Sequence, residues 1–388
     1  MKVYWYWPNP FVAGHPMAEA LSALGEELVV HSLATRDARP IERQVAGYEV
    51  VRGLPETLPR SRRRWALDRL AIYRERARLR RALVEERGFD VCHLFQLNHW
   101  TDGRALRRLG RRTALVSTVH DVVPHHRRLP AWVERRLLRA TYRHAGTLVV
   151  AHRWLADRLR AEFGVAAERI RVIPPPIEAP PGGLRARAAE AAPGAPVRVL
   201  FFGQLRDNKG IPDLLEAARL LAGEAALSFH LAGRGEPALE AAVRGAAGEL
   251  EHLTCELGYV PAERKAELFG AADLVVLPYR RFASQSAVLG DAYTHAVPVV
   301  ATDCGAMGMT VREDRTGWLV PPGDPGALAE ALRAAARDLP ERRRIAGTML
   351  ELQRRHDVAA VARALRELYR EAASTASTQG SFSSGISR

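Results

Sequence analysis

A short loop between an apolar run and a helix gathers the residue types that bind phosphate groups. The run 197–202 ends at Gly203, and Arg206 and Lys209 follow before Gly210. Glycine allows close backbone approach, and two cations with the amides of a following helix can offset the charge of a diphosphate. The spacing predicts a diphosphate-binding loop, although a solvated turn with two unrelated cations fits this stretch equally well.

A second polar segment follows the apolar run 274–277 and contains Ser284, Gln285 and Ser286 ahead of a predicted helix. The N-terminus of a helix attracts anions, and serine hydroxyls can donate to them. Asp291, further along the same helix, could accept hydrogen bonds from ribose hydroxyls. A Ser-x-Ser sequence alone is more often a helix cap than a ligand site.

Short β-branched runs alternate with Ala-, Leu- and Arg-rich segments, a pattern typical of parallel βαβ units. The predicted strands are 3–7, 27–31, 91–94, 114–118, 147–151, 170–173, 197–202, 228–232, 274–277 and 298–301. The predicted helices are 18–24, 67–84, 132–143, 213–221, 238–248, 263–270 and 287–294. The chain is therefore expected to be an α/β protein with two doubly wound parallel-sheet domains, a hinge and a binding cleft between them.

Proline and glycine clusters place the domain boundaries. Residues 1–178 form the predicted N-terminal domain, and 179–196, rich in both residue types, form a linker. Residues 197–355 form the predicted C-terminal domain. A helix over 356–372 is expected to pack back on the N-terminal domain, and the low-complexity tail 373–388 is expected to be disordered.

Composition limits the class of protein. The chain has 388 residues, of which 47% are hydrophobic and 26% charged, enough for two globular cores. No apolar run approaches the roughly 18 residues of a membrane-spanning helix, and the first residues lack a signal-peptide pattern. Cys92, Cys255 and Cys304 stand apart without metal-ligand spacing. We expect a cytoplasmic protein with no metal site.

The net charge of +13 lies in the first half of the chain. An arginine-rich run from Arg60 to Arg81 contributes to this excess. The excess of positive charge is compatible with three explanations. One is a coding bias toward arginine and alanine, and another is peripheral contact with the anionic inner face of a membrane. The third, nucleic acid, is disfavoured because no recognition motif is present, so no nucleic-acid partner is expected.

The order of these motifs resembles family 4 glycosyltransferases, the retaining, glycogen-synthase-like group 1 enzymes whose GT-B fold has two facing Rossmann-like domains. The matching stretches are His120–Asp121, Val172–Pro176, Phe202–Gly210, Leu231–Gly235, Ala272–Tyr279, Ser284–Ser286, Pro298–Gly305 and Thr316–Asp324. The resemblance implies transfer of a sugar from a nucleotide-diphosphate sugar to a hydroxyl acceptor, with retention of configuration. The acceptor would be a secondary metabolite or a lipid-linked or cell-surface saccharide. Neither a metal nor a further cofactor is implied.

The resemblance also implies roles for individual residues. Arg206 and Lys209 would hold the diphosphate and act in catalysis together with His120, which would contact the donor sugar from the first domain. The remaining donor-binding residues would be Gly203, Gly210, Ser284, Gln285, Ser286 and Asp291. The acceptor side would be formed by Gly14, His15, His120 and Asp121.

Three departures from the family pattern suggest an alternative. Ala283 stands where many members have a sugar-binding glutamate, Ala296 replaces a usual glycine, and residues 307–309 contain no glutamate. A catalytically degenerate nucleotide-sugar-binding protein, acting as an assembly or regulatory partner, is therefore a second hypothesis. A dehydrogenase is disfavoured, because no Gly-x-Gly-x-x-Gly follows the first strand.

Overall fold

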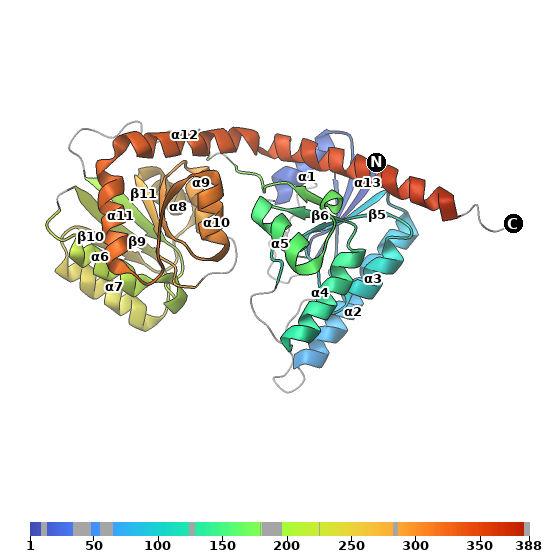
Figure 1. Ribbon diagram of the computed structural model, residues 1–388, viewed down its shortest axis with the longest axis horizontal. Coiled ribbons are helices and arrows are strands. Elements are labelled where there is room, and N and C mark those ends of the chain that lie inside the picture. Colours follow the sequence, from blue (N-terminus) through green and yellow to red (C-terminus); the bar gives the residue numbers. More distant parts are fainter. Residues whose placement is uncertain are drawn as a thin grey trace. The chain divides into compact units, whose positions relative to one another are not determined.

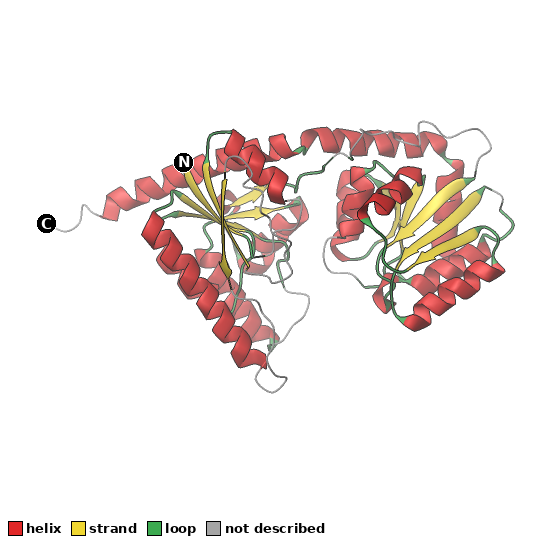
Figure 2. Cartoon of the chain, turned by 180° about the vertical axis from the view of Figure 1, so that it is seen from behind, coloured by secondary structure: helices red, strands yellow, loops and turns green. Residues whose placement is uncertain are grey.

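The computed structural model describes residues 1–8, 14–33, 48–54, 65–123, 129–178, 180, 196–224, 226–281 and 286–383. The chain forms two compact units. Unit 1 comprises Met1–Pro176 together with Val358–Arg388, and unit 2 comprises Ile177–Asp357. Each unit contains a parallel sheet with helices on both faces (Figures 1 and 2). The α/β two-domain architecture that the sequence predicts is confirmed.

The sheet of unit 1 has the strand order β3-β2-β1-β4-β5-β6-β7, and neighbouring strands are parallel. The strands are β1 (Lys2–Tyr6), β2 (Glu27–Leu33), β3 (Tyr48–Leu54), β4 (Val91–Leu94), β5 (Ala114–Thr118), β6 (Thr147–Val150) and β7 (Ile170–Val172). The chain moves outward in opposite directions from β1 and β4. Their carboxyl ends therefore form the switch point at which doubly wound sheets bind ligands.

Helices cover both faces of this sheet because successive residues of β1 point to opposite sides. Val3 and Trp5 enter the core beneath α1 and α13, whereas Tyr4 and Tyr6 enter the core on the other face. The helical segments are α1 (Gly14–Ala23), α2 (Trp65–Arg87), α3 (Asp102–Leu109), α4 (Ala131–His144), α5 (Arg153–Phe163), the 3₁₀ turn η1 (Ala167–Arg169) and α13 (Val358–Ser383). Helix α13 packs against α1 and β5 (Figure 1).

The sheet of unit 2 has the order β10-β9-β8-β11-β12-β13, again parallel, with its switch point between β8 and β11. Its strands are β8 (Val197–Phe202), β9 (Leu227–Gly233), β10 (Leu253–Leu257), β11 (Leu274–Leu277), β12 (Val299–Thr302) and β13 (Gly317–Val320). Its helical segments are η3 (Asp207–Lys209), α6 (Ile211–Leu220), α7 (Pro237–Glu249), α8 (Ala262–Ala271), α9 (Ala287–Thr294), α10 (Gly305–Asp314), α11 (Pro325–Arg337) and α12 (Leu339–Arg355). Every residue of β11 and β12 is buried, as expected for central parallel strands.

The C-terminal segment differs from the predicted pattern. The sequence predicts disorder from 373, but α13 continues to Ser383, and residues 384–388 lie outside the described residues. Ala372, Ala373 and Ala376 pack against the core of unit 1 on one side of the helix, which explains why it extends further. Of the predicted linker, the structure describes Pro180 and Pro196.

Candidate functional site

The loop after β8 is fitted closely to the end of β11. It runs from Gly203 through η3 to Gly210, which adopts the left-handed conformation with φ 67°. A Cβ at Gly210 would lie 1.8 Å from the carbonyl oxygen of Pro278, so this position requires glycine. The loop that carries Arg206 and Lys209 therefore lies directly beside the segment that leaves β11.

Polar contacts fix these two loops to each other. The guanidinium of Arg280 donates to both carboxylate oxygens of Asp213, at 2.7 and 2.6 Å, and the Asp213 side chain is buried. The backbone N–H of Arg280 donates to the carbonyl of Asn208 at 3.0 Å, and the Asn208 amide donates to the carbonyl of Arg281 at 3.2 Å. The loops after the two switch-point strands thus form one continuous surface.

Lys209 lies over an aromatic ring within this surface. Its Nζ is 3.6 Å from the ring centroid of Tyr279, a cation–π contact. Burial, and then the nearby charge of Arg206, lowers the pKa of Lys209 to about 8. The Tyr279 hydroxyl is 3.3 Å from Oγ of Ser286, so the ring connects the lysine to the start of α9.

Ser286 is the N-cap of α9. Its buried Oγ accepts a hydrogen bond from the N–H of Leu289 at 3.3 Å. A capping role leaves the first backbone amides of the helix as the groups that can donate to an anion. A Cβ built on Gly203 would lie 3.6 Å from Val288, which places the end of β8 beside that first turn. Ser284 and Gln285 lie outside the described residues.

Asp291 lies further along α9 and is held by an ion pair. Nζ of Lys265, from α8, donates to its Oδ1 at 2.7 Å, and both side chains are partly exposed. Sequence reasoning did not find this partner. It also missed the buried Asp213–Arg280 pair and the position of Tyr279 between Lys209 and Ser286. Only Tyr279 had a sequence signal, since it follows a buried apolar strand.

In unit 1, His120 lies at the carboxyl edge of the sheet, two residues after β5. Its Nε2 donates to the carbonyl oxygen of Phe95, which follows β4, at 2.9 Å. Asp121 comes next and is partly exposed. Gly14 is the first residue of α1, after the loop that leaves β1, whereas the side chain of His15 lies outside the described residues.

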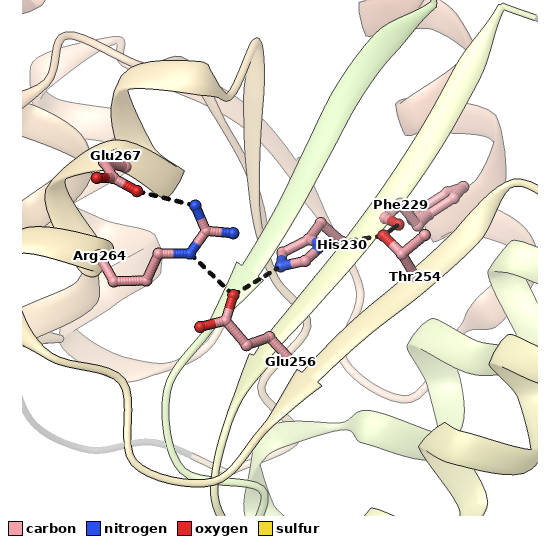
Figure 3. A network of polar contacts seen from close by, with 6 residues as sticks. All are labelled: Phe229, His230, Thr254, Glu256, Arg264 and Glu267. Carbon is pink, nitrogen blue, oxygen red and sulfur yellow. Dashed lines mark hydrogen bonds and ion pairs between the residues drawn. The ribbon is translucent and has the colours of Figure 1, made fainter.

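A separate cavity of about 380 Å³ lies over the amino-terminal halves of β8, β9 and β10, against α8. The Arg264 guanidinium donates to Glu256 at 3.0 Å and to Glu267 at 2.9 Å. His230 lies between Thr254 and Glu256 (Figure 3). None of the site residues predicted from the sequence lines this cavity. Its polar groups interact largely with one another, so we treat it as a structural network.

Among the residues that the structure describes, no group of three or more His, Cys, Asp and Glu side chains is arranged to hold a metal ion. Within the same ranges, no helix is both long enough and apolar enough to span a membrane.

Two doubly wound units, with a cationic loop and a capped helix at the switch point of the second, define a GT-B glycosyltransferase architecture. The family model described as Glycosyltransferase Family 4 matches residues 15–179, and the model described as Glycosyl transferases group 1 matches residues 196–338. The chain belongs to the group 1, family 4 glycosyltransferases.

Individual similar proteins agree with this assignment. The phosphatidyl-myo-inositol mannosyltransferase of Mycobacterium leprae is 30% identical over 78% of this chain and 78% of its own. The fold is similar to that of sucrose-phosphate synthase from Thermosynechococcus elongatus, with a TM-score of 0.69, 20% identity, and coverage of 95% of this chain and 98% of that one. It is also similar to Anabaena HepE in complex with UDP-glucose, with a TM-score of 0.62, 17% identity, and coverage of 96% and 100%.

Proposed function

We propose that this glycosyltransferase moves a sugar from a nucleoside-diphosphate sugar to a hydroxyl acceptor, with retention of configuration and without a metal ion. The observation that carries the proposal is the surface formed by the loops after β8 and β11, where Tyr279 connects Lys209 to the start of α9 and Arg206 lies close enough to Lys209 to lower its pKa. Two cations and the positive end of a helix offset the charge of a diphosphate.

In the proposed reaction, the two cations and the start of α9 stabilise the leaving group. As the bond between the sugar and the diphosphate breaks, negative charge grows on the departing phosphate oxygen. In this proposal, Arg206, Lys209 and the amides of α9 stabilise that charge, which is how a preorganised site lowers a barrier. The structure of HepE with UDP-glucose supports a nucleotide-sugar donor for a chain of this fold.

The acceptor belongs to unit 1 in this proposal. The acceptor hydroxyl attacks on the face that the leaving group departs from, and the departing phosphate oxygen takes its proton. No protein nucleophile is then needed. His120, held through Nε2 by the carbonyl of Phe95, would contact the donor sugar. Asp121 and the start of α1 at Gly14 would line the acceptor side.

Two exposed apolar side chains favour an acceptor attached to a membrane lipid. Leu67 and Trp132 are 67% and 72% exposed, and each lies in the first turn of an arginine-rich helix, α2 or α4. Tryptophan prefers the interface of a bilayer, and arginine is attracted to anionic headgroups. The M. leprae mannosyltransferase takes its name from a phospholipid, which agrees with a lipid-linked acceptor.

Incubation of the purified protein with UDP-, GDP- and TDP-sugars tests the transferase proposal. Slow release of nucleoside diphosphate from one donor is expected, and its rate should fall at least tenfold in Arg206→Ala and Lys209→Ala. Arg264→Ala is the matched control, because this arginine pairs with Glu256 and Glu267 and with none of the proposed site residues. Tight donor binding without turnover on any acceptor would instead support the nucleotide-sugar-binding alternative.

The membrane proposal has its own test, co-sedimentation with vesicles. Binding to vesicles that contain anionic lipid should exceed binding to neutral vesicles, and Trp132→Ala should reduce it. Tyr259→Ala removes a side chain of unit 2 that is 79% exposed and serves as the control. Equal binding by all three proteins would argue against membrane contact through α4.

A further inference from the structure

A chain of buried hydrogen bonds joins the C-terminal helix to the sheet edge that carries His120. Tyr369 of α13 is fully buried, and its Oη lies 3.0 Å from Nε1 of Trp5 and 2.6 Å from Nδ1 of His93. Nε2 of His93 lies 2.9 Å from Oγ1 of Thr118. Four side chains, from α13, β1, β4 and β5, are thereby connected within unit 1.

The chemistry of these groups fixes the direction of the hydrogen bonds. An indole N–H only donates, so Oη of Tyr369 accepts from Trp5. The buried phenol hydrogen then needs an acceptor of its own, and Nδ1 of His93 is at hydrogen-bond distance. Burial, with a smaller effect of nearby His120, lowers the pKa of His93 to about 3, so its ring is neutral. Its single hydrogen is therefore on Nε2 and is donated to Thr118.

The hydroxyl of Thr118 is the outer end of this chain. Because Oγ1 accepts from His93, its own hydrogen is directed away from the imidazole. Thr118 is the last residue of β5, is partly exposed, and precedes His120 by two residues. In the ranges that the structure describes, no protein group accepts that hydrogen. It is thus oriented as a donor at the carboxyl edge of the sheet.

The same imidazole supports the residue that holds His120. The ring of His93 stacks on Phe95 with centroids 4.0 Å apart, and Phe95 also stacks on Trp7 at 4.4 Å. The carbonyl oxygen of Phe95 is the acceptor for Nε2 of His120. The orientation of His93 therefore affects two polar groups at this edge, the Thr118 hydroxyl and the His120 ring.

We propose that the Thr118 hydroxyl donates a hydrogen bond to a hydroxyl oxygen of the bound sugar or acceptor, and that Tyr369 is a positioning residue that sets its direction through His93. The inference rests on the proposed function, which places substrate at this edge. It assigns to the C-terminal helix a role in orienting a substrate contact, in addition to its role in the core of unit 1.

Nitrogen-15 NMR of the full-length protein tests the hydrogen-bond chain without turnover. The His93 imidazole, assigned by its loss in His93→Gln, should carry its hydrogen on Nε2 across neutral pH. Tyr369→Phe should shift the Nδ1 resonance, because it loses the phenol donor. Tyr4→Phe, which removes an equally buried hydroxyl bonded to His31 at 2.8 Å, should leave it unchanged. A hydrogen on Nδ1 in the wild type would overturn the chain.

Steady-state kinetics test the substrate contact. Thr118→Val should lower kcat about three- to tenfold with the KM for donor little changed, and Thr118→Ser should restore it. Tyr369→Phe should lower kcat in the same direction. The double variant should be no slower than Thr118→Val alone, because both changes interrupt one interaction. If the two substitutions lower kcat independently, so that their effects multiply in the double variant, Tyr369 does not act through Thr118.

The two tests separate this inference from the proposed function. If the wild type transfers no sugar from any donor, the proposed function fails, and the Thr118 contact fails with it. The NMR result would still decide whether Tyr369 orients His93. If transfer occurs but Thr118→Val is as fast as the wild type, only the inference is wrong. Thermal unfolding of each variant, expected within a few degrees of the wild type, confirms that it is folded.

Discussion

At the scale of single residues, the proposed binding of a diphosphate depends on the positive charge of Lys209. Its ammonium lies over the Tyr279 ring and near the charge of Arg206, in a half-buried position. Burial penalises the charged form, and the neighbouring arginine adds repulsion. A bound anion would favour the charged form and offset both effects, which agrees with the proposal that Lys209 holds a diphosphate.

This environment predicts a pH dependence of nucleotide binding. The pKa of Lys209 in the free protein is about 8, and a bound diphosphate raises it, so binding takes up a proton above that pH. The affinity for nucleoside diphosphate should be constant near pH 7 and fall by up to about tenfold per pH unit above 8. Lys209→Arg, which stays charged, should abolish the fall. Titration calorimetry from pH 7 to 10 measures it, and an identical decline in both proteins would contradict this role.

Individual contacts were only partly predictable from the sequence. Arg206, Lys209 and Gly210 are close together in the chain, and their types suggested a phosphate-binding loop, although a solvated turn fitted equally well until the resemblance to the family was considered. The Asp291–Lys265 and Asp213–Arg280 pairs join residues from different elements, and local spacing contains no information about them. The roles of Ser284 and Gln285 remain predictions, because both residues lie outside the described ranges.

At the scale of elements, the switch point of unit 2 depends on how closely the β8 and β11 loops pack. Gly210 is the contact point, since its left-handed backbone brings it against the carbonyl of Pro278. The Arg280–Asp213 pair then holds the same two loops together. The positions of Arg206 and Lys209 therefore depend on both loops. A substitution in either loop should change how the site binds a nucleotide.

Gly210→Ala tests this packing. The added methyl group must displace the loop or the end of β11, and the left-handed backbone adds strain of about 1–3 kcal/mol. We expect a lower melting temperature together with weaker nucleotide binding. Gly245→Ala is the control, because Gly245 lies exposed in α7 with open space around it and the change should stabilise the protein slightly. A Gly210→Ala protein with unchanged melting and binding would contradict the account.

The strands that the sequence analysis missed share a physical cause. β3, β10 and β13 lie at edges of their sheets, where one face or part of each strand stays in contact with solvent. β3 and β10 therefore lack the continuous apolar run that identified β11 and β12, and the short apolar run of β13 is only partly buried. Central strands were predictable because burial on both faces leaves a composition signal, and edge strands leave a weaker one.

At the scale of the whole molecule, unit 2 is an insertion into unit 1. The chain enters unit 2 at Ile177 and leaves it at Asp357, and the N–H of Ile177 donates to the carbonyl of His356 at 2.9 Å. The ends of unit 2 are therefore adjacent, and the described residues that form its hydrophobic core all belong to unit 2. Unit 1, in contrast, needs α13 to complete its core.

A fragment of residues 177–357 should therefore fold alone with one cooperative thermal transition. The complementary prediction is that a chain ending at Asp357 loses the cooperative melting of unit 1, because Leu365, Leu368 and Tyr369 no longer fill that core. Circular dichroism and calorimetry distinguish these outcomes. A fragment 177–357 without a cooperative transition would show that the insertion depends on unit 1.

The central claim is that a nucleoside diphosphate is bound by Arg206, Lys209 and the start of α9. Titration calorimetry of the full-length protein with UDP, GDP and TDP tests it most directly, with the wild type, Arg206→Ala, Lys209→Ala and Arg264→Ala compared at pH 7. We predict one bound nucleotide per chain, an affinity about 10- to 100-fold weaker in each of the first two variants, and no change in Arg264→Ala. Wild-type affinity in both Arg206→Ala and Lys209→Ala would contradict the account. So would the absence of binding of any of the three nucleotides to the wild type.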